Sequence, residues 1–538
     1  MTSLSFRCVS ASLGVEIFIK LIAPFYPTDE KLSIAPFFYI DLVCKPAPKA
    51  EERIAGDIMA ALLAPEDAAI TREGSGVVLR RTYRMTPDVP CEEADEFSRG
   101  DFAGAITLVP IRGKMTLREN TFSIPYSVDE GTETRATFVL AAHCDEPILR
   151  ANGTPHRFRY LRWFPNLAEV AAYARDEEAE IVERVNFFDE LFLRCSTGHC
   201  EKNLIAYSFQ SHLSTTWWTE PASGGPDWFG SWDSQALHNS MESEYASSLL
   251  YLNLWPDLLE RQLDQRASFE KETGYLPATC GRFLSLQSSG QRAAGVEEAC
   301  DYLLMMFAHW RWWNRFEPIK RQFPLIRRLG NLLLCSEPVQ PEHPHGRAHT
   351  EPCLMLKTLC ALEALAIMAD ELEDGDLSES CSRSVKALRT KLEERARPGD
   401  HFNVGSGNGG QDAAENRRGP TADEDDRYSI HTLKGLLHHL MCDSFPELDY
   451  GLLRQDTLSS ATHTLSDYGC ASAGAGRDKF SISQNIWRDI TAAYLGINFA
   501  LMAERYWSFQ VLANVNGCGG CYVDSHDSRN LACDPRGA

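Results

Sequence analysis

The sequence predicts an N-terminal antiparallel β-sandwich followed by a large helical toroid. Two observations lead to this fold class. Short apolar or alternating runs occupy the chain from about residue 10 to residue 145, and long stretches with apolar residues at spacings of three and four occupy most of the rest. With 538 residues, the chain is also long enough to form two or three domains with sizeable cores.

The N-terminal part reads as a series of β-strands. Segments such as VEIFIKLIAPF, GVVLRRTYRM and ATFVLAAHC are apolar or alternating, and Pro, Gly, Asp and Asn separate them. This pattern is typical of short antiparallel strands. We therefore predict a β-sandwich over residues 1–155 and a basic, aromatic linker over residues 156–170, HRFRYLRWFPNLAEV.

From residue 171 to residue 538 the apolar period is that of helices. In EACDYLLMMFAHWRWW, spacings of three and four place five apolar residues on one face of a buried helix, namely Leu303, Met306, Phe307, Trp310 and Trp313. The stretches CLMLKTLCALEALAIMADEL and SQNIWRDITAAYLGI continue the pattern. Loops rich in Gly, Pro, Trp and His separate these stretches. The pattern predicts an α/α toroid in which loops at one end form the site.

Composition restricts the class of partner. Asp and Glu outnumber Lys and Arg by 75 to 53, so the formal net charge is −22. Nucleic acids and anionic membrane surfaces require clustered cations, and this balance disfavours both, whereas it suits a neutral carbohydrate. We find neither an uninterrupted apolar run of about 18 residues nor a secretory signal pattern, and therefore expect no integral membrane segment and a cytoplasmic location.

The cysteines do not indicate a metal centre. Most of the 17 cysteines are scattered, several of them in apolar helical stretches, which favours buried free thiols. Two tighter spacings, Cys195/Cys200 with His199 and Cys518/Cys521, do not complete a four-ligand set at zinc-site spacing. We therefore expect no metal site and no cofactor.

Several longer strings occur in a definite order. They are LIAPFYPTDEKLSIAPFFYIDLV, RFRYLRWFPNLAEVAAYA, LHNSMESEYASSLLYLNLWPDLLERQLD, VEEACDYLLMMFAHWRWW and SISQNIWRDITAAYLGI. Together they resemble the glycoside hydrolase clan that contains family 116 (bile-acid type β-glucosidases and glucosylceramidases) and family 52 (β-xylosidases). The resemblance covers most of the chain, and it implies an (α/α)6 barrel of the six-hairpin glycosidase kind.

The resemblance also directs attention to three candidate catalytic residues. Retaining glycosidases use two carboxyl groups about 5–5.5 Å apart, one as nucleophile and one as acid/base. The family nucleophile aligns with Ser231, so Asp233 becomes the candidate, with a helix cap as its alternative role. Glu242 stands where the clan has a supporting Asp. The loop in which the resemblance places the acid/base Asp contains no Asp, and its only acids are Glu342 and Glu351. Glu351 is the candidate, and helix N-terminal stabilisation is its alternative role.

Five further residues are candidates for substrate binding. Trp228 and Trp232 are candidate stacking platforms for a sugar ring. Asn239 matches the clan's signature position and either binds a sugar hydroxyl or caps a turn. Asn485 stands near a sugar-binding Glu of the clan, and Arg488 follows one turn later as a candidate or as a member of a structural ion pair.

The departures from the clan leave two functions open. Ala278 and Thr279 occupy the positions of a His and an Asp, and can supply neither an imidazole nor a carboxylate. The first prediction is a retaining β-glycosidase that acts on a β-glucoside or a β-xyloside. The alternative is a catalytically inactive carbohydrate-binding relative with the same fold.

Overall fold

The computed structural model describes most of the chain, and this part divides into two compact units. The described residues are 2–10, 12, 14–47, 54–63, 65, 68–85, 100–118, 120–128, 133–194, 198–232, 237–270, 276–282, 284–286, 295–336, 351–394, 396, 402, 429–471, 479–499, 502–513, 525–527 and 532–534. Unit 1 comprises Met1–Thr197, Trp217–Trp228 and Phe283–Leu286. Unit 2 comprises Gly198–Thr216, Phe229–Arg282 and Gln287–Ala538.

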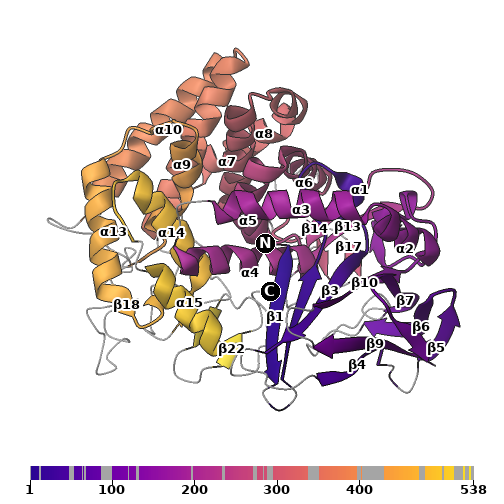
Figure 1. Ribbon diagram of the computed structural model, residues 1–538. Coiled ribbons are helices and arrows are strands. Elements are labelled where there is room, and N and C mark those ends of the chain that lie inside the picture. The colour runs from indigo at the N-terminus through magenta and orange to yellow at the C-terminus, as the bar shows by residue number, and fades with distance from the viewer. Residues whose placement is uncertain are drawn as a thin grey trace. The chain divides into compact units, whose positions relative to one another are not determined.

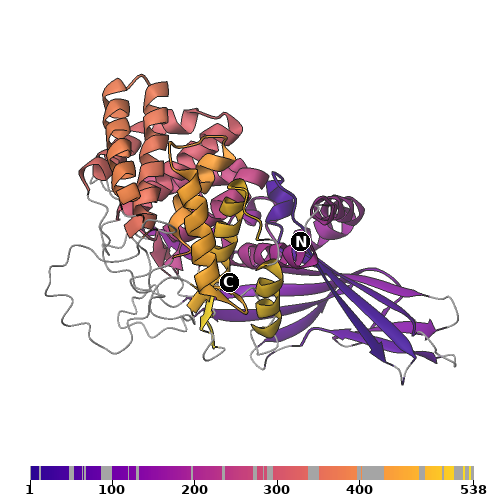
Figure 2. The ribbon, with the colours of Figure 1, turned by 90° about the vertical axis from the view of Figure 1, so that its left-hand side faces the viewer.

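Unit 1 is built on a seven-stranded antiparallel sheet with the strand order β1-β2-β3-β10-β7-β6-β5 (Figure 1). Its strands are β1 (Ser3–Ser10), β2 (Val15–Ile22), β3 (Phe37–Pro46), β5 (Ala69–Glu73), β6 (Gly76–Met85), β7 (Gly100–Arg112) and β10 (Thr134–His143). Strands β3 and β10 are distant in sequence but pair directly, with Phe138 opposite Ile40. Figure 2 shows the long strands of this sheet lying beside one another.

A second, three-stranded sheet covers one face of the large sheet. It contains β4 (Ile54–Ala61), β8 (Thr116–Arg118) and β9 (Thr121–Val128), in the order β4-β9-β8. Phe122 of β9 meets Phe138 of β10 edge to face, with ring centroids 5.3 Å apart. Val77, Leu108 and Ile124 complete the buried layer between the sheets. The predicted N-terminal antiparallel sandwich is therefore confirmed.

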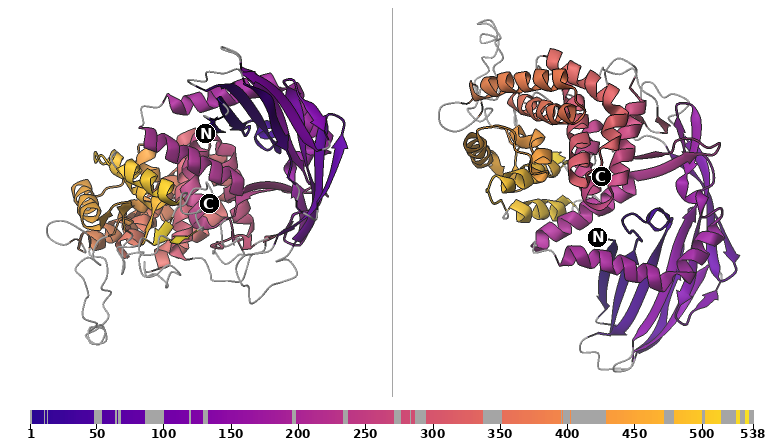
Figure 3. Two further views of the ribbon diagram at one scale, coloured as in Figure 1. Left: turned by 60° about the horizontal axis from the view of Figure 1, so that its bottom comes forward. Right: turned by 90° about the horizontal axis from the view of Figure 1, so that it is seen from above.

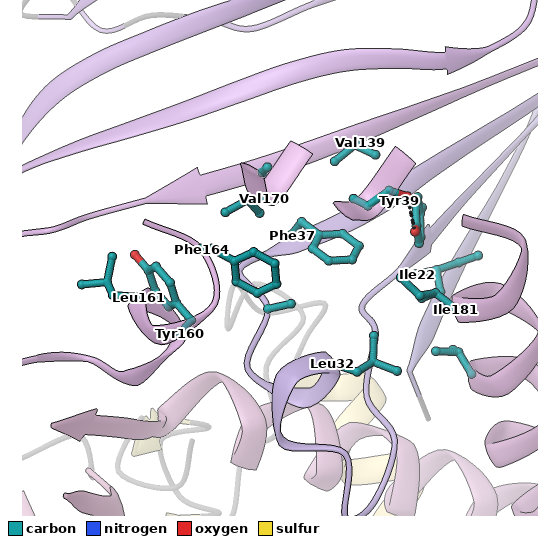
Figure 4. Close-up of a cluster of buried hydrophobic side chains, with 14 residues drawn as sticks. Ile22, Leu32, Phe37, Tyr39, Val139, Tyr160, Leu161, Phe164, Val170 and Ile181 are labelled. Carbon is teal, nitrogen blue, oxygen red and sulfur yellow. Dashed lines mark hydrogen bonds between the residues drawn. The ribbon is translucent and has the colours of Figure 1, made fainter. Parts of the chain in front are cut away.

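Two helices cover the opposite face of the large sheet (Figure 3). They are α2 (Leu167–Asp176), which begins at the N-cap Asn166, and α3 (Glu178–Leu193). Their apolar residues Val170 and Ile181 join the sheet residues in one core, where the Tyr39 hydroxyl donates to the Ala174 carbonyl at 2.7 Å (Figure 4).

This packing moves the predicted domain boundary. We expected a linker at residues 156–170 and the helical domain from residue 171, yet the contacts assign the chain to unit 1 as far as Thr197. The physical reason is that the apolar stripe of α2 and α3 is buried on a sheet and not on another helix. Residues 154–162 likewise form strand β12 (Thr154–Phe158) and the 3-10 helix η1 (Arg159–Arg162), not an extended linker.

Smaller elements complete unit 1. They are α1 (Glu30–Ser33), β11 (Leu149–Ala151), β13 (Thr216–Pro221) and β17 (Ser285–Leu286). The Arg159 guanidinium donates to Asp227 at 2.7 Å, and the Trp218 indole donates to the same carboxylate oxygen at 2.6 Å. Asp227 thus accepts from both side chains within unit 1.

Unit 2 is a set of helical hairpins. Its helices are α4 (His199–Thr215), α5 (Met241–Leu254), α6 (Pro256–Ser268), α7 (Val296–Trp313), α8 (Glu317–Cys335), α9 (Glu351–Glu371), α10 (Gly375–Glu394), η3 (Thr432–Gly435), α12 (Leu437–Met441), α13 (Tyr450–Thr464), α14 (Ile482–Tyr494) and α15 (Met502–Ala513). Helices α5, α7 and α9 contact α6, α8 and α10, respectively (Figure 1). In addition, α5 contacts α7, and α7 contacts α9. Helix α9 also contacts η3, and η3 contacts α14. This alternation of inner and outer helices is the pattern of an α/α toroid.

Short strands and one long apolar helix complete unit 2. The strands are β14 (Trp228–Ser231), β15 (Leu237–His238), β16 (Gly281–Arg282), β18 (Leu465–Ser466), β19 (Gly469–Cys470), β20 (Lys479–Ser481), β21 (Ser525–Asp527) and β22 (Ala532–Asp534). By length and composition alone, the stretch Pro352–Glu371 of α9 is apolar enough to cross a membrane, but 89% of its apolar window is buried inside the protein. The core helices of globular domains are often as long and as apolar as this one.

Candidate active site

The first turns of several inner helices of unit 2 meet around one set of charged side chains. Glu242 is the second residue of α5, Glu297 is the second residue of α7, and Gln484 is the third residue of α14. Lys357 lies in the second turn of α9, and Lys434 lies on η3. We call these five residues, together with Asp301 of α7, the charged cluster.

Lys357 is the deepest member of the charged cluster. Its ammonium lies 2.5 Å from Asp301 Oδ1 and 2.8 Å from Glu297 Oε1, and its side chain is 1% exposed. It also lies 4.7 Å from the centre of the Tyr245 ring. Burial by itself lowers the pKa of this ammonium, but the carboxylates of Asp301 and Glu297 outweigh burial and hold the pKa well above its usual value. Lys357 is therefore a permanent buried cation.

Lys434 joins two carboxylates from different helices. Its ammonium lies 3.0 Å from Glu242 Oε1 and 3.9 Å from Glu297 Oε1. Burial lowers its pKa, whereas Glu242 and Glu297 raise it, and the net effect is a raised pKa. The backbone of Lys434 is held as well, because its carbonyl accepts from the Tyr245 hydroxyl at 2.8 Å and from the Trp487 indole at 3.2 Å.

A glycine allows η3 to approach α9 closely enough to place Lys434 there. A Cβ atom on Gly435 would lie 2.5 Å from the Lys357 Cα atom, which is shorter than real Cβ contacts. Any larger residue at position 435 would push η3 away from α9. The spacing between Lys434 and Lys357 thus depends on the absence of a side chain at Gly435.

Glu242 is the most exposed member among the ion-paired side chains. It is 46% exposed, against 21% for Glu297, and it also accepts from the Gln484 amide at 2.8 Å. Because the Oε1 atoms of Glu242 and Glu297 contact the same ammonium at 3.0 and 3.9 Å, these two atoms cannot be farther apart than the sum of the two distances. This limit admits the separation of about 5–5.5 Å of retaining glycosidases and also the lower end, about 6.5 Å, of the inverting range.

The charge of the cluster does not balance. Within the described part of the chain it contains the three carboxylates of Glu242, Glu297 and Asp301 and the two ammonium groups of Lys357 and Lys434. If all five groups are ionised, one negative charge is in excess, but burial raises the pKa of Asp301 to about 7, so this carboxyl is partly protonated near neutral pH. Such a site attracts a positive charge that develops on a bound molecule, or it takes up one proton.

The three predicted catalytic residues have different outcomes. Glu242 lies in the charged cluster. Glu351 is the first residue of α9, so its backbone lies at the helix end that leads to Lys357, but its side chain is outside the described part of the structure. Asp233 also lies outside the described residues. The catalytic roles of all three stay predictions.

Asn239 lies in an internal clamp. It adopts a left-handed conformation with φ +47° and is buried. Its amide donates to Glu244 Oε1 at 2.6 Å, and Arg266 pairs with the other oxygen of that carboxylate at 2.6 Å. Arg266 also donates to the Pro277 carbonyl at 2.6 Å. Asn239 thus ties the start of α5 to the scaffold, in agreement with the turn alternative. Glu244 thus pairs with Arg266, whereas Glu242 pairs with Lys434.

Asn485 and Arg488 also have internal partners. The Asn485 side chain exchanges hydrogen bonds with both backbone groups of Cys470, at 3.0 and 2.9 Å. Arg488 donates to Asp489 at 2.9 Å and lies 4.7 Å from the centre of the Phe499 ring. Both side chains are buried and serve the packing of α14, so we do not include them among the residues proposed to bind a sugar.

The two candidate tryptophans belong to different units. Trp228 is buried and is assigned to unit 1, whereas Trp232 is partly exposed in unit 2, where its backbone amide donates to the Thr215 carbonyl at 3.1 Å. Their predicted role as stacking platforms stays a prediction.

Of the five charged side chains in the charged cluster, sequence reasoning missed four: Glu297, Asp301, Lys357 and Lys434. The available signal was a single charge within an apolar helical run, as in CLMLKTLCAL and EACDYLLMMF. Lys and Asp are almost never fully buried unless they are paired, so two such charges in neighbouring core helices indicate a buried ion pair. Within the described ranges, no group of three or more His, Cys, Asp or Glu side chains is arranged to hold a metal ion.

Comparisons with known proteins identify no family, and the solved structures that match are distant. No family model matches the sequence, and no curated protein matches it. A rhamnosidase from Klebsiella oxytoca with rhamnose bound is 9% identical, with a TM-score of 0.44, over 100% of this chain and 92% of that one. A putative kojibiose phosphorylase from the human microbiome is 10% identical, with a TM-score of 0.41, over 97% and 75% of the two chains. A bacterial glucoamylase in complex with acarbose is 10% identical, with a TM-score of 0.40, over 75% of this chain, which spans 59% of the glucoamylase.

Proposed function

We propose that this protein is a glycoside hydrolase of the retaining β-glycosidase type that acts on a β-glucoside or a β-xyloside. The observation that carries the proposal is the pair of carboxylates Glu242 and Glu297, which share Lys434 at the N-terminal ends of neighbouring inner helices. The ordered strings that resemble families 116 and 52 support the same reaction class. Glu351 at the start of α9 and Asp233 remain part of the proposed site.

The chemistry of the charged cluster fits this reaction. Hydrolysis of a glycosidic bond passes through an oxocarbenium-like transition state, which carries positive charge on the sugar ring. An ionised carboxylate of the pair Glu242 and Glu297 would stabilise that charge, and a neutral sugar in the ground state would gain less from it. The Gln484 amide is positioned beside Glu242 and offers hydrogen-bonding groups of the kind that bind sugar hydroxyls.

The alternative is a catalytically inactive carbohydrate-binding relative. It is favoured by the segment that contains Ala278 and Thr279, where the clan has a sugar-contacting His. The backbone of this segment serves the scaffold: the Ala278 carbonyl accepts from the Met241 amide at 2.8 Å, and the Cys280 amide donates to the His238 carbonyl at 2.9 Å. The backbone contacts of Ala278 and Cys280 are thus present, although this segment lacks the imidazole of the sugar-contacting His.

Turnover of simple substrates separates the two proposals. The glycosidase proposal expects 4-nitrophenol release from 4-nitrophenyl β-glucoside or β-xyloside, with the β-anomer as the first product in proton NMR spectra. Glu242→Gln is expected to reduce this rate by about 10²–10⁴-fold, the usual loss when an acid/base group is removed. Glu317→Gln, an exposed carboxylate on α8, is the control and should keep the full rate. No release from either substrate, together with thermal stabilisation by glucose or xylose, would establish the inactive relative instead.

A further inference from the structure

We propose that strand β1 is the contact surface of a homodimer, in which β1 of one copy pairs antiparallel with β1 of a second copy and joins the two large sheets into one. The proposal concerns unit 1 and is independent of the proposed glycosidase function. It rests on the open edge of this strand, on the apolar side chains along it and on the position of its single charged residue.

β1 (Ser3–Ser10) forms an open edge of the seven-stranded sheet. Within the described part of the chain it pairs with β2 alone, in a register that is unbroken over all eight residues (Figure 1). It contains no proline, and its single charged residue, Arg7, pairs with Glu16 of the neighbouring β2. Proteins usually protect an edge strand with proline, a bulge, several charges or a covering element, because its backbone can pair with another strand. β1 has none of the first three devices.

The backbone groups on the open edge belong to alternate residues of β1. The Ala23 amide donates to the Thr2 carbonyl at 2.8 Å, so these two residues form a pair of the hydrogen-bonded type. In an antiparallel ladder the two types of pair alternate, so the even-numbered residues of β1 direct their backbone groups to β2. The odd-numbered residues, among them Ser5 and Arg7, therefore direct their N–H and C=O groups to the open edge.

Leu4 and Phe6 make this edge apolar. They are 39% and 50% exposed, and they stand opposite Leu21 and Ile19 of β2, which are themselves only partly buried. Exposed apolar side chains beside an open strand edge favour contact with another strand. Pairing would cover these side chains and satisfy the backbone groups at the same time.

The order of side chains on β1 suits a second copy of the same strand. A twofold axis perpendicular to the sheet pairs β1 with itself in antiparallel fashion, and opposite residues then lie on the same face. The register centred on Arg7 would place two guanidinium groups opposite each other, which is unfavourable. The register centred on Phe6 places the two Phe6 side chains opposite each other, Leu4 opposite Cys8, and Arg7 opposite the uncharged Ser5.

The register centred on Phe6 also matches the backbone. Ser5 and Arg7 form its hydrogen-bonded pairs, and these are residues whose N–H and C=O groups are directed to the open edge. Phe6 and Leu4 occupy non-hydrogen-bonded positions, where opposite side chains lie closest. A single strand pair is a small contact of the kind found in weak complexes, so the dimer should depend on protein concentration.

Sedimentation velocity of the full chain over a wide range of protein concentration tests for the dimer. The wild type should show a monomer–dimer equilibrium. Phe6→Lys should abolish the dimer, because two ammonium groups would lie opposite each other. Met59→Lys, at an exposed apolar residue of β4, is the matched control and should keep the dimer. A wild type that stays monomeric at every concentration, or a dimer that Phe6→Lys leaves intact, would overturn the proposal.

A disulfide tests the register without weakening the contact. Cys8 is an exposed free thiol, and it faces Leu4 of the second copy at a distance of about 4.5 Å between Cα atoms, which a disulfide can span. Leu4→Cys should therefore give a covalent dimer on oxidation, with residue 4 of one copy linked to residue 8 of the other in peptide mass spectra. Within one copy these residues lie too far apart along the strand to be linked.

The double variant Leu4→Cys, Cys8→Ser is the control for this link and should stay reducible to no covalent dimer, because the two copies of residue 4 are distant in the proposed register. The wild type should likewise form no covalent dimer through Cys8. A link between the two copies of residue 4, or between the two copies of Cys8, would overturn the register. The absence of any link between residues 4 and 8 would overturn it as well.

Discussion

Arg266 and Glu244 form an ion pair in the interior of unit 2, with 2.6 Å between the guanidinium and the carboxylate and side chains only 1% and 3% exposed. Burial raises the pKa of Glu244, and Arg266 and the Asn239 amide oppose this effect. The pair also holds the backbone at Asn239 and Pro277. It therefore fixes the first turn of α5, which carries Glu242.

Arg266→Met is expected to lower the free energy of unfolding by about 3–5 kcal/mol, because it leaves the Glu244 carboxylate buried without its cation. Urea denaturation followed by circular dichroism measures the change. Arg321→Met is the matched control, since its pair with Asp264 is largely exposed and should contribute at most about 1 kcal/mol. Equal losses in the two variants would contradict the structural role of the buried pair.

Lys357→Met should also destabilise unit 2 by about 3–5 kcal/mol, because Asp301 and Glu297 would lose the buried cation that pairs with both of them. In a double-mutant cycle, Asp301→Asn should recover part of this loss. Lys320→Met, in an exposed pair with Glu317, serves as the control and should have little effect. If the Asp301 and Lys357 changes were additive, the two side chains would not interact in the folded protein.

Gly230→Ala should destabilise the protein by about 1–3 kcal/mol, the range for overpacking in a well-packed interior. A Cβ atom there would lie 1.7 Å from Asn239 Oδ1, and Asn239 cannot move freely because its amide is bonded to Glu244. Gly375→Ala in the first turn of α10 provides the comparison, since no atom lies within 4 Å of the added Cβ. Differential scanning calorimetry should show a lower melting temperature for the first variant and an unchanged or higher one for the second.

His438 should make the protein sensitive to acid. Burial, and then the charges of His439 and Lys357, lower its pKa to about 3, while the same residue in the unfolded chain titrates near its ordinary value of 6.5. The unfolded state therefore binds more protons between these pH values, and stability falls as the pH decreases below 6.5, by up to about 1.4 kcal/mol per pH unit. His438→Gln should make this slope shallower in urea titrations at several pH values. The exposed His463 provides His463→Gln, which should keep the wild-type slope.

The change from strands to helices was predictable because the two structures bury apolar residues at different periods. The segment ATFVLAAHC became β10, and EACDYLLMMFAHW became the buried part of α7. The partner of an amphipathic helix was not predictable in the same way. The stripe that includes Val170 and Ile181 would suit a helix or a sheet, and the fold places it on a sheet.

The sequence predicted a member of the candidate site only where neighbouring residues formed a recognisable motif. Glu242 follows the Asn239 signature closely and was found. Glu297, Lys357 and Lys434 come from separate helices, and each alone looks like an ordinary charge on a helix.

The sequence by itself determined the order of the two architectures and the excess of negative charge, because hydrophobic period and composition are local properties of the chain. Only the tertiary structure decided that Asn239, Asn485 and Arg488 are used internally and that Glu242 and Glu297 share one ammonium. The physical reason is that an ion pair between helices depends on which helix ends meet, and this is settled by the packing of the whole helical unit.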